Sequence, residues 1–219
     1  ILNTANEAVS DFRPISLIHS FAKIITKVMA MRLAPHMNRL ISKSQSAFIK
    51  KRSIHDNFMS VRCAVRRFHR VRTPALFLKL DISKAFDSVR WEYLLTLMSK
   101  LGFPPKWREW VAVLLSTSSS RILLNGVPNA PIKHGRGVRQ GDPLSPLLFV
   151  IAVDPLQRLL DLATEEGLLK KFKGKHSVMR TSMYADDTAI FVKPNKKDVT
   201  AITDILTKFG EVTGFKTNF

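Results

Sequence analysis

The chain has 219 residues, of which 45% are hydrophobic, and its net charge is +18. This size and composition suit one sizeable folded domain or two small ones, and they exclude a disordered tail. The positive charge predicts a polyanionic partner, either nucleic acid or an anionic membrane surface, against the alternative of a merely basic soluble protein.

Cysteine content and apolar runs narrow the class of protein further. The single cysteine, Cys63, excludes an internal disulfide and a zinc site built from several cysteines. The longest apolar run, Leu147 to Val153, is too short to cross a bilayer, and the basic residues are spread along the chain, so we expect no membrane partner. The chain starts without Met or a signal pattern, so we expect a fragment or a trimmed domain.

The N-terminal third predicts two helices. The first covers residues 19–34, with His19 or Ser20 as its cap, and Pro35 ends or kinks it. The second covers residues 54–70. The apolar residues that recur at helical spacing in the two helices are Phe21, Ile24, Ile25 and Val28, then Phe58, Val61, Val65 and Phe68.

The second predicted helix carries a basic face. Arg62, Arg66 and Arg70 recur every four residues and therefore share one side of the helix. We interpret this face as a nucleic-acid contact, with a merely solvated charged face as an equally open alternative.

The remaining elements mix strands and helices without strict alternation. This order predicts an α+β fold with helices packed on one face of a sheet. In chain order we expect a strand at 75–82, helices at 89–101 and 106–115, a hairpin around Asn125-Gly126, a helix from Ser145-Pro146 to about Pro155, two short strands within 178–192 and a helix at 196–209.

Three carboxylates are the candidate catalytic groups. Asp186 and Asp187 stand side by side within a β-prone apolar segment, where they repel each other unless a solvated turn, a cation or a metal relieves them. Asp81 ends an apolar strand earlier in the chain. If the two strands share one sheet, the three side chains form an oxygen-rich site suited to Mg²⁺. A hairpin turn and a capping carboxylate are the plainer alternatives.

A glycine-rich loop at residues 135–146 precedes the predicted Ser145-Pro146 helix start. Its glycines permit a close backbone approach to a ligand, and Arg136 and Arg139 can neutralise phosphate. Gln140 can bond to sugar or base edges. Taken alone, the loop is also compatible with an ordinary connection.

These segments together resemble the palm motifs of reverse transcriptases. The resemblance rests on the Asp81 strand, Arg139-Gln140-Gly141-Asp142-Pro143-Leu144-Ser145-Pro146 and Tyr184-Ala185-Asp186-Asp187, in that order. Asp11-Phe12-Arg13-Pro14-Ile15-Ser16-Leu17 and Gln45-Ser46-Ala47-Phe48-Ile49 are similar to the fingers segments of long interspersed, non-LTR retrotransposons. The resemblance covers almost the whole chain.

The resemblance implies a right-hand polymerase fold and roles for single residues. It implies one domain over residues 1–219, with about 1–72 mainly fingers and about 73–219 mainly palm with interleaved fingers elements, and no thumb. Asp81, Asp186 and Asp187 are then ligands of two Mg²⁺ ions, which Mn²⁺ can replace. The other implied roles are sugar selection by Phe86, a nucleotide pocket at Gln140, Gly141 and Arg13, and primer contact by Tyr184.

The implied function is RNA-directed DNA synthesis from an RNA template, a DNA primer and deoxynucleoside triphosphates, in the nucleus if the chain acts as its family does. Lys51 stands where the family usually has glycine, and this departure predicts strain in that loop. Two rivals stay open here: an inactive, polymerase-derived domain that binds nucleic acid, and a metal-dependent phosphohydrolase.

Overall fold

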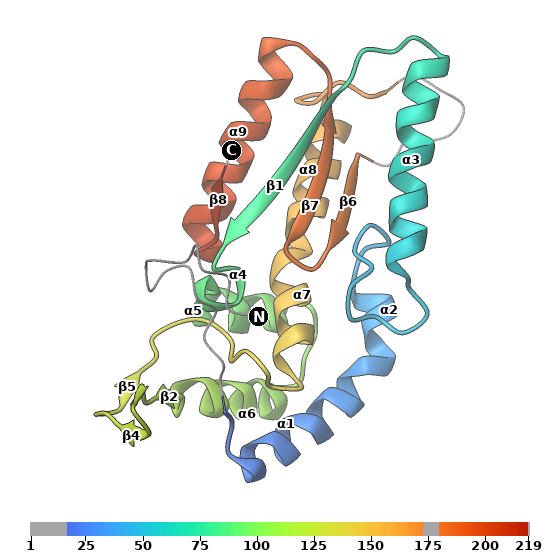
Figure 1. Cartoon of the computed structure of the whole chain (residues 1–219). Coiled ribbons are helices and arrows are strands. Elements are labelled where there is room, and N and C mark those ends of the chain that lie inside the picture. Colours follow the sequence, from blue (N-terminus) through green and yellow to red (C-terminus); the bar gives the residue numbers. More distant parts are fainter. Residues whose placement is uncertain (1–16, 173–179, 219) are drawn as a thin grey trace.

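The computed structural model describes residues 17–172 and 180–218 (Figure 1). It contains both helices and antiparallel sheet, which confirms the α+β prediction. The helices are α1 (Ser20–Leu33), η2 (Ala34–His36), α2 (Met37–Leu40), α3 (Ile54–Arg70), α4 (Ala85–Ser88), α5 (Trp91–Lys100), α6 (Pro105–Ser116), α7 (Ser145–Val153), α8 (Pro155–Glu165) and α9 (Lys196–Thr213). The strands are β1 (Leu76–Ser83), β2 (Ser119–Ser120), β3 (Leu123–Leu124), β4 (Val127–Pro128), β5 (Ile132–Lys133), β6 (Thr181–Tyr184), β7 (Asp187–Val192) and β8 (Lys216–Asn218).

The main sheet has the strand order β6-β7-β1-β8 and is antiparallel throughout. Side chains alternate between its two faces. Leu80 and Ile82 of β1, with Ile190 and Val192 of β7, are buried on the face that α8 and α9 cover (Figure 1). The opposite face carries Lys79 and Asp81, which are exposed, so this face is open near Asp81, whereas α3 packs on it at Phe191.

One continuous hydrophobic core joins the N-terminal and C-terminal parts of the chain. It includes Met37 of α2, Leu80 of β1, Phe149 of α7 and Leu206 of α9, each at most 2% exposed. From Leu147 to Val153, α7 is buried all around, as its unbroken apolar sequence predicts. It ends before Pro155, where α8 begins, at the predicted break.

The first helix has the predicted position, but its predicted buried stripe is wrong. His19 caps α1 by accepting a bond from the Phe21 backbone N–H. However, Phe21 is 68% exposed and Ile24 is 63% exposed, while Met29 and Leu33 are buried. Only the C-terminal half of α1 reaches the core, so burial follows the contacts of that half and not the apolar spacing of the first two turns.

The second helix is similar. Ser53 caps α3 as predicted, by accepting a bond from the His55 N–H. Phe68 is buried and packs on Phe191 at the open face of the sheet, whereas Phe58 is 63% exposed. The helix therefore contacts the sheet at its C-terminal end, and its predicted stripe is buried in part.

The small hairpin of β3 and β4 turns at Asn125 and Gly126, as predicted. Both have positive φ, 50° and 81°, which suits a two-residue turn of primed type.

Across residues 17–172 and 180–218, no helix combines the length and the apolar character that crossing a bilayer requires.

Candidate active site

Pairing between β1 and β7 brings the distant carboxylates to one place. The register runs from Leu76 opposite Val192 to Leu80 opposite Thr188. Its next position sets Asp81 against Asp187, 106 residues further along the chain. Leu80 and Thr188 are buried, so alternation directs Asp81 and Asp187 to the open face.

Asp186 lies in the turn between β6 and β7. Tyr184 pairs with Asp187, which leaves Ala185 and Asp186 as the two turn residues. Asp186 is half-buried and Asp187 is exposed. The predicted short strands and the solvated turn are therefore both present. The turn lies at the same end of the strands as Asp81.

The donor set fits a hard divalent cation, but the three side chains do not converge as they stand. Within the described part of the chain, no group of three His, Cys, Asp or Glu side chains is placed to hold a metal ion. Asp187 is engaged elsewhere, because its Oδ1 lies 3.2 Å from the Lys79 Nζ. Carboxylates on one face also repel each other. Three oxygen-bearing, water-accessible groups at one edge nevertheless match what Mg²⁺ prefers.

The glycine-rich loop packs against α4 and Val89, which follow β1 in the chain. Gly137 N–H donates to the Val89 carbonyl at 2.8 Å, and Val138 N–H donates to the Phe86 carbonyl at 2.8 Å. Trp91 Nε1 donates to the Gly137 carbonyl at 2.7 Å. A Cβ on Gly137 would lie 2.8 Å from the Asp87 Cα, so only glycine permits this approach. The loop is thus fixed to the segment that follows the Asp81 strand.

Side chains of this loop have different environments. Gln140, Gly141 and Arg136 are exposed. Arg139 is half-buried and donates to the Leu114 carbonyl at 3.1 Å, so its guanidinium also fixes the end of α6. The predicted phosphate contact at Arg139 therefore competes with a structural role.

Phe86 is partly buried against the core. Its ring stacks on Phe149 with centroids 4.5 Å apart and an interplanar angle of 16°. Tyr184 is 38% exposed at the end of β6. The arginines of the α3 face, Arg62, Arg66 and Arg70, are all exposed. Arg13 lies outside the described residues.

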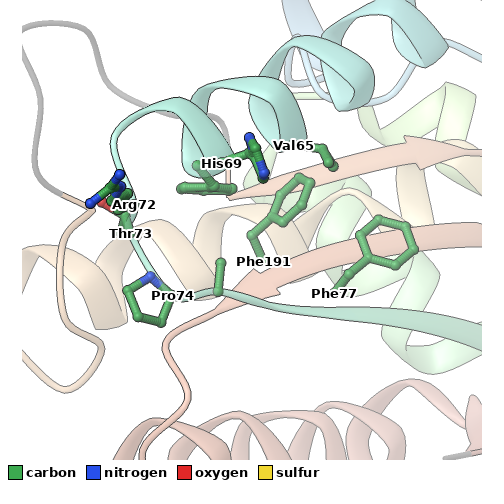
Figure 2. Close-up of a pocket in the computed structure, with 9 residues that line it drawn as sticks. Val65, His69, Arg72, Thr73, Pro74, Phe77 and Phe191 are labelled. Carbon is green, nitrogen blue, oxygen red and sulfur yellow. The ribbon is translucent and has the colours of Figure 1, made fainter.

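A hollow of about 660 Å³ lies between the C-terminal end of α3 and the sheet, away from these carboxylates. Figure 2 shows the rings of Phe77 and Phe191 with Val65 and His69 of α3 around it. None of the three aspartates is among its lining residues. The hollow is mainly apolar and holds no acidic group suited to the predicted chemistry.

Two residues near the carboxylates, Lys79 and Gln45, received no role at the site from the sequence. Lys79 stands two positions before Asp81, so strand alternation alone was a sufficient signal that both face the same side. Gln45 contacts the backbone of Ala185, 140 residues away, with bond lengths of 3.2 and 3.0 Å. No periodicity or spacing in the sequence indicates that contact.

Comparison with known proteins gives one family over nearly the whole chain. The family model described as "Reverse transcriptase (RNA-dependent DNA polymerase)" matches residues 4–219. A transposon TX1 uncharacterized 149 kDa protein of Xenopus laevis is 32% identical over 182 residues, covering 83% of this chain and 14% of that protein. The RNA-directed DNA polymerase from mobile element jockey of Drosophila melanogaster is 28% identical over 205 residues, 92% of this chain and 21% of that protein.

A third relative is similar over most of this chain, and one solved structure has a similar fold. The polyprotein of type-2 retrotransposable element R2DM of Drosophila melanogaster is 27% identical over 208 residues, covering 95% of this chain and 19% of that protein. The chain therefore spans a minor part of the length of these curated relatives. Telomerase from Candida albicans superposes with a TM-score of 0.58 at 14% identity, covering 91% of this chain and 33% of that one. This likeness concerns the fold.

Proposed function

Because this chain belongs to the reverse transcriptase (RNA-dependent DNA polymerase) family, we propose that it catalyses RNA-directed DNA synthesis by adding deoxynucleotides to a primer 3′-hydroxyl. Relatives named for the R2 and jockey elements confirm the resemblance to polymerases of long interspersed, non-LTR retrotransposons. The alternative of an inactive binding domain is not favoured by these matches.

The observation that carries the proposal is the β1–β7 register. The register ends at the Leu80–Thr188 pair, and its continuation by one residue would bring Asp81 opposite Asp187 on the open side of the sheet, with Asp186 in the adjoining turn. Asp81, Asp186 and Asp187 are thus the residues that would hold the metal ions. When bound, two divalent cations, Mg²⁺ or in its place Mn²⁺, would supply the positive charge that activates the primer hydroxyl and stabilises the leaving pyrophosphate.

The protein's own side chains position the reactants. The loop of Gln140 and Gly141, whose neighbouring residues are held against α4, would line the nucleotide pocket, and Arg13 would reach the triphosphate. Phe86 would lie under the incoming sugar, with its ring fixed by the stack on Phe149. Such fixed positioning, together with charge stabilisation, accounts for most of the rate enhancement in phosphoryl transfer.

Nucleic acid would be held by the basic surface. We assign phosphate contacts to the α3 arginines, Arg62, Arg66 and Arg70, and to Arg136 and Arg139, with Tyr184 near the primer end. The partners would be an RNA template and a DNA primer, in keeping with the +18 net charge. We assign residues from about 1 to 72 mainly to fingers and residues from about 73 to 219 mainly to palm.

The test is primer extension on an RNA template with Mg²⁺ and deoxynucleotides, with Asp186→Asn as the matched variant. The substitution keeps side-chain size and removes a charge, so we expect at least about a hundredfold loss of incorporation, as for removal of a key charge-stabilising group. Circular dichroism would establish that the variant is folded. The same assay is run on a longer protein that contains this chain, so that the shorter and the longer form are compared.

Two outcomes would overturn the proposal. One is incorporation by wild type and Asp186→Asn at equal rates. The other is folded protein that binds RNA–DNA duplex yet extends no primer in either the shorter or the longer form, which would leave a binding role. Release of nucleotides from nucleic acid without a triphosphate substrate would instead identify the phosphohydrolase.

A further inference from the structure

The turn that carries Asp186 is held by a side chain from outside the sheet. Gln45 is fully buried, and its Oε1 accepts from the Ala185 N–H at 3.0 Å while its Nε2 donates to the Ala185 carbonyl at 3.2 Å. The same oxygen accepts from the Ala47 N–H at 3.0 Å. One carboxamide thus satisfies both backbone groups of the residue next to Asp186.

This contact belongs to a longer attachment along the outer edge of β6. Ser44 accepts from the Met183 N–H at 2.9 Å, and the Ser46 N–H donates to the Met183 carbonyl at 3.1 Å. Asn57 of α3 donates to that same carbonyl at 2.7 Å. The segment around Gln45 therefore covers a strand edge that would otherwise present unpaired backbone groups.

The attachment is itself fixed by the half-buried guanidinium of Arg52. Arg52 donates to the carbonyls of Gln45 at 2.6 Å and Ile41 at 3.0 Å, and also to that of Ser42. Ser42 in turn donates through its backbone N–H to the buried Asp154 at 2.9 Å. Gln45 consequently projects from a segment that is tied to the core at several points.

The turn needs such support because of its sequence. Ala185 has a φ of 54°, in the left-handed region that residues with a Cβ adopt at a cost, and the turn lacks the glycine that would relieve it. A two-residue turn with an unfavoured conformation is free to move unless its backbone groups are bonded to something rigid. Gln45 supplies those bonds.

We propose that Gln45 is a positioning residue that fixes the Ala185–Asp186 turn, next to Asp187, through its two hydrogen bonds to Ala185. It acts through the turn and does not touch the reactants. The inference rests on the proposed function, because the turn that Gln45 fixes carries a proposed metal ligand of that same site.

The test measures metal binding directly, with Mn²⁺ as the probe and electron paramagnetic resonance of the full chain as the readout. Gln45→Met keeps the side-chain length and removes both bonds, so we expect Mn²⁺ binding to weaken about tenfold, the factor that supporting residues of metal sites typically contribute. The Mg²⁺ concentration for half-maximal primer extension should rise by a similar factor. Hydrogen exchange at the Ala185 amide should become faster.

Tyr93→Phe is the matched control. It removes one partly buried hydrogen bond, from the Tyr93 hydroxyl to the Ala152 carbonyl, at a place that contains none of the proposed ligands. It should lower the free energy of unfolding, while the affinity for Mn²⁺ stays within about twofold of wild type. A loss of stability at a distant site does not move the turn that carries Asp186. Gln45→Asn keeps an amide but is too short to make both bonds, and it provides a milder variant if Gln45→Met does not fold.

The two proposals fail differently. If wild type binds Mn²⁺ and Asp186→Asn does not, the metal site stands, and unchanged binding in the folded Gln45 variants then overturns the positioning role. If the control weakens Mn²⁺ binding as much as Gln45→Met does, the effect is one of stability, and the role is overturned as well. If wild-type binding does not depend on Asp186, both proposals fall.

Discussion

The Lys79 ammonium lies 3.2 Å from the Asp187 Oδ1, on the open face of the sheet. This ion pair places a cation of the protein at one of the proposed metal ligands. A divalent ion must displace the ammonium to use that oxygen fully. Both side chains are more than half exposed, 69% and 62%, so water screens their attraction.

Lys79→Gln should therefore tighten Mn²⁺ binding. An exposed pair contributes about 0.2–1 kcal/mol, which corresponds to at most about a fivefold gain in affinity. Isothermal titration calorimetry without nucleic acid measures this affinity for Mn²⁺. Lys106→Gln is the control, because Lys106 forms a similarly exposed pair with Glu109 at 3.3 Å on α6. Weaker binding in Lys79→Gln than in Lys106→Gln would contradict this view of the ion pair.

Gly137→Ala should displace the glycine-rich loop from α4 and so destabilise the chain. A methyl group would meet the Asp87 Cα and carbonyl oxygen, both at 2.8 Å, in addition to the strain of a φ of 86°. We expect a loss of about 2–4 kcal/mol in the free energy of unfolding, measured in urea. Gly167→Ala separates the two causes, since it has a φ of 77° but no atom within 4 Å of the added carbon. It should cost about 1 kcal/mol. Equal losses would show that the close approach contributes nothing.

The strands and the turn that carry the three aspartates were predictable because their signals are local. An apolar strand that ends at Asp81 and a β-prone segment around Asp186 and Asp187 imply neighbouring strands once the family resemblance is considered. Strand alternation then fixes which side each carboxylate faces. Lys79 follows from the same alternation.

The rest depended on contacts that no local pattern encodes. Gln45 sits in a short polar segment, and only the three-dimensional path of that segment along β6 shows that it reaches Ala185. The apolar spacing in α1 predicted the helix correctly but not its buried side, because Phe21 and Ile24 extend beyond the core that Met29 and Leu33 contact. Periodicity reports an apolar face, not what covers it.

Lys51 confirms the strain that its sequence position suggests. Its φ is 69°, in the left-handed region. Lys51→Gly should stabilise the chain by about 0.5–1 kcal/mol, because glycine removes the steric cost of that conformation. Lys50→Gly, at the preceding position without a positive φ, should destabilise it by a similar amount through added chain entropy. Thermal unfolding of the two variants gives opposite signs if the backbone conformation is the cause.

Alkaline pH should lower the stability of the folded chain through Tyr93. Burial raises the pKa of its phenol well above the usual range, with the Asp154 carboxylate acting in the same direction. The folded protein then keeps the proton while the unfolded chain loses it above about pH 10, so stability falls by about 1.4 kcal/mol per pH unit there. Tyr93→Phe should remove this part of the slope, although it lowers stability at neutral pH. Tyr184→Phe, at a site that is 38% exposed, should keep the slope.

Sugar selection offers a test of Phe86 that is independent of the metal ligands. If its ring blocks a 2′-hydroxyl, Phe86→Val should open that space and raise ribonucleotide incorporation relative to deoxynucleotide incorporation about tenfold, a change of about 1.4 kcal/mol in discrimination. The substitution also breaks the stack on Phe149. Phe149→Leu disturbs the same stack from the core side, where Phe149 is fully buried, and should leave the ratio unchanged. A ratio that rises equally in both variants would assign Phe86 to the core alone, since packing and not the sugar contact would then control it.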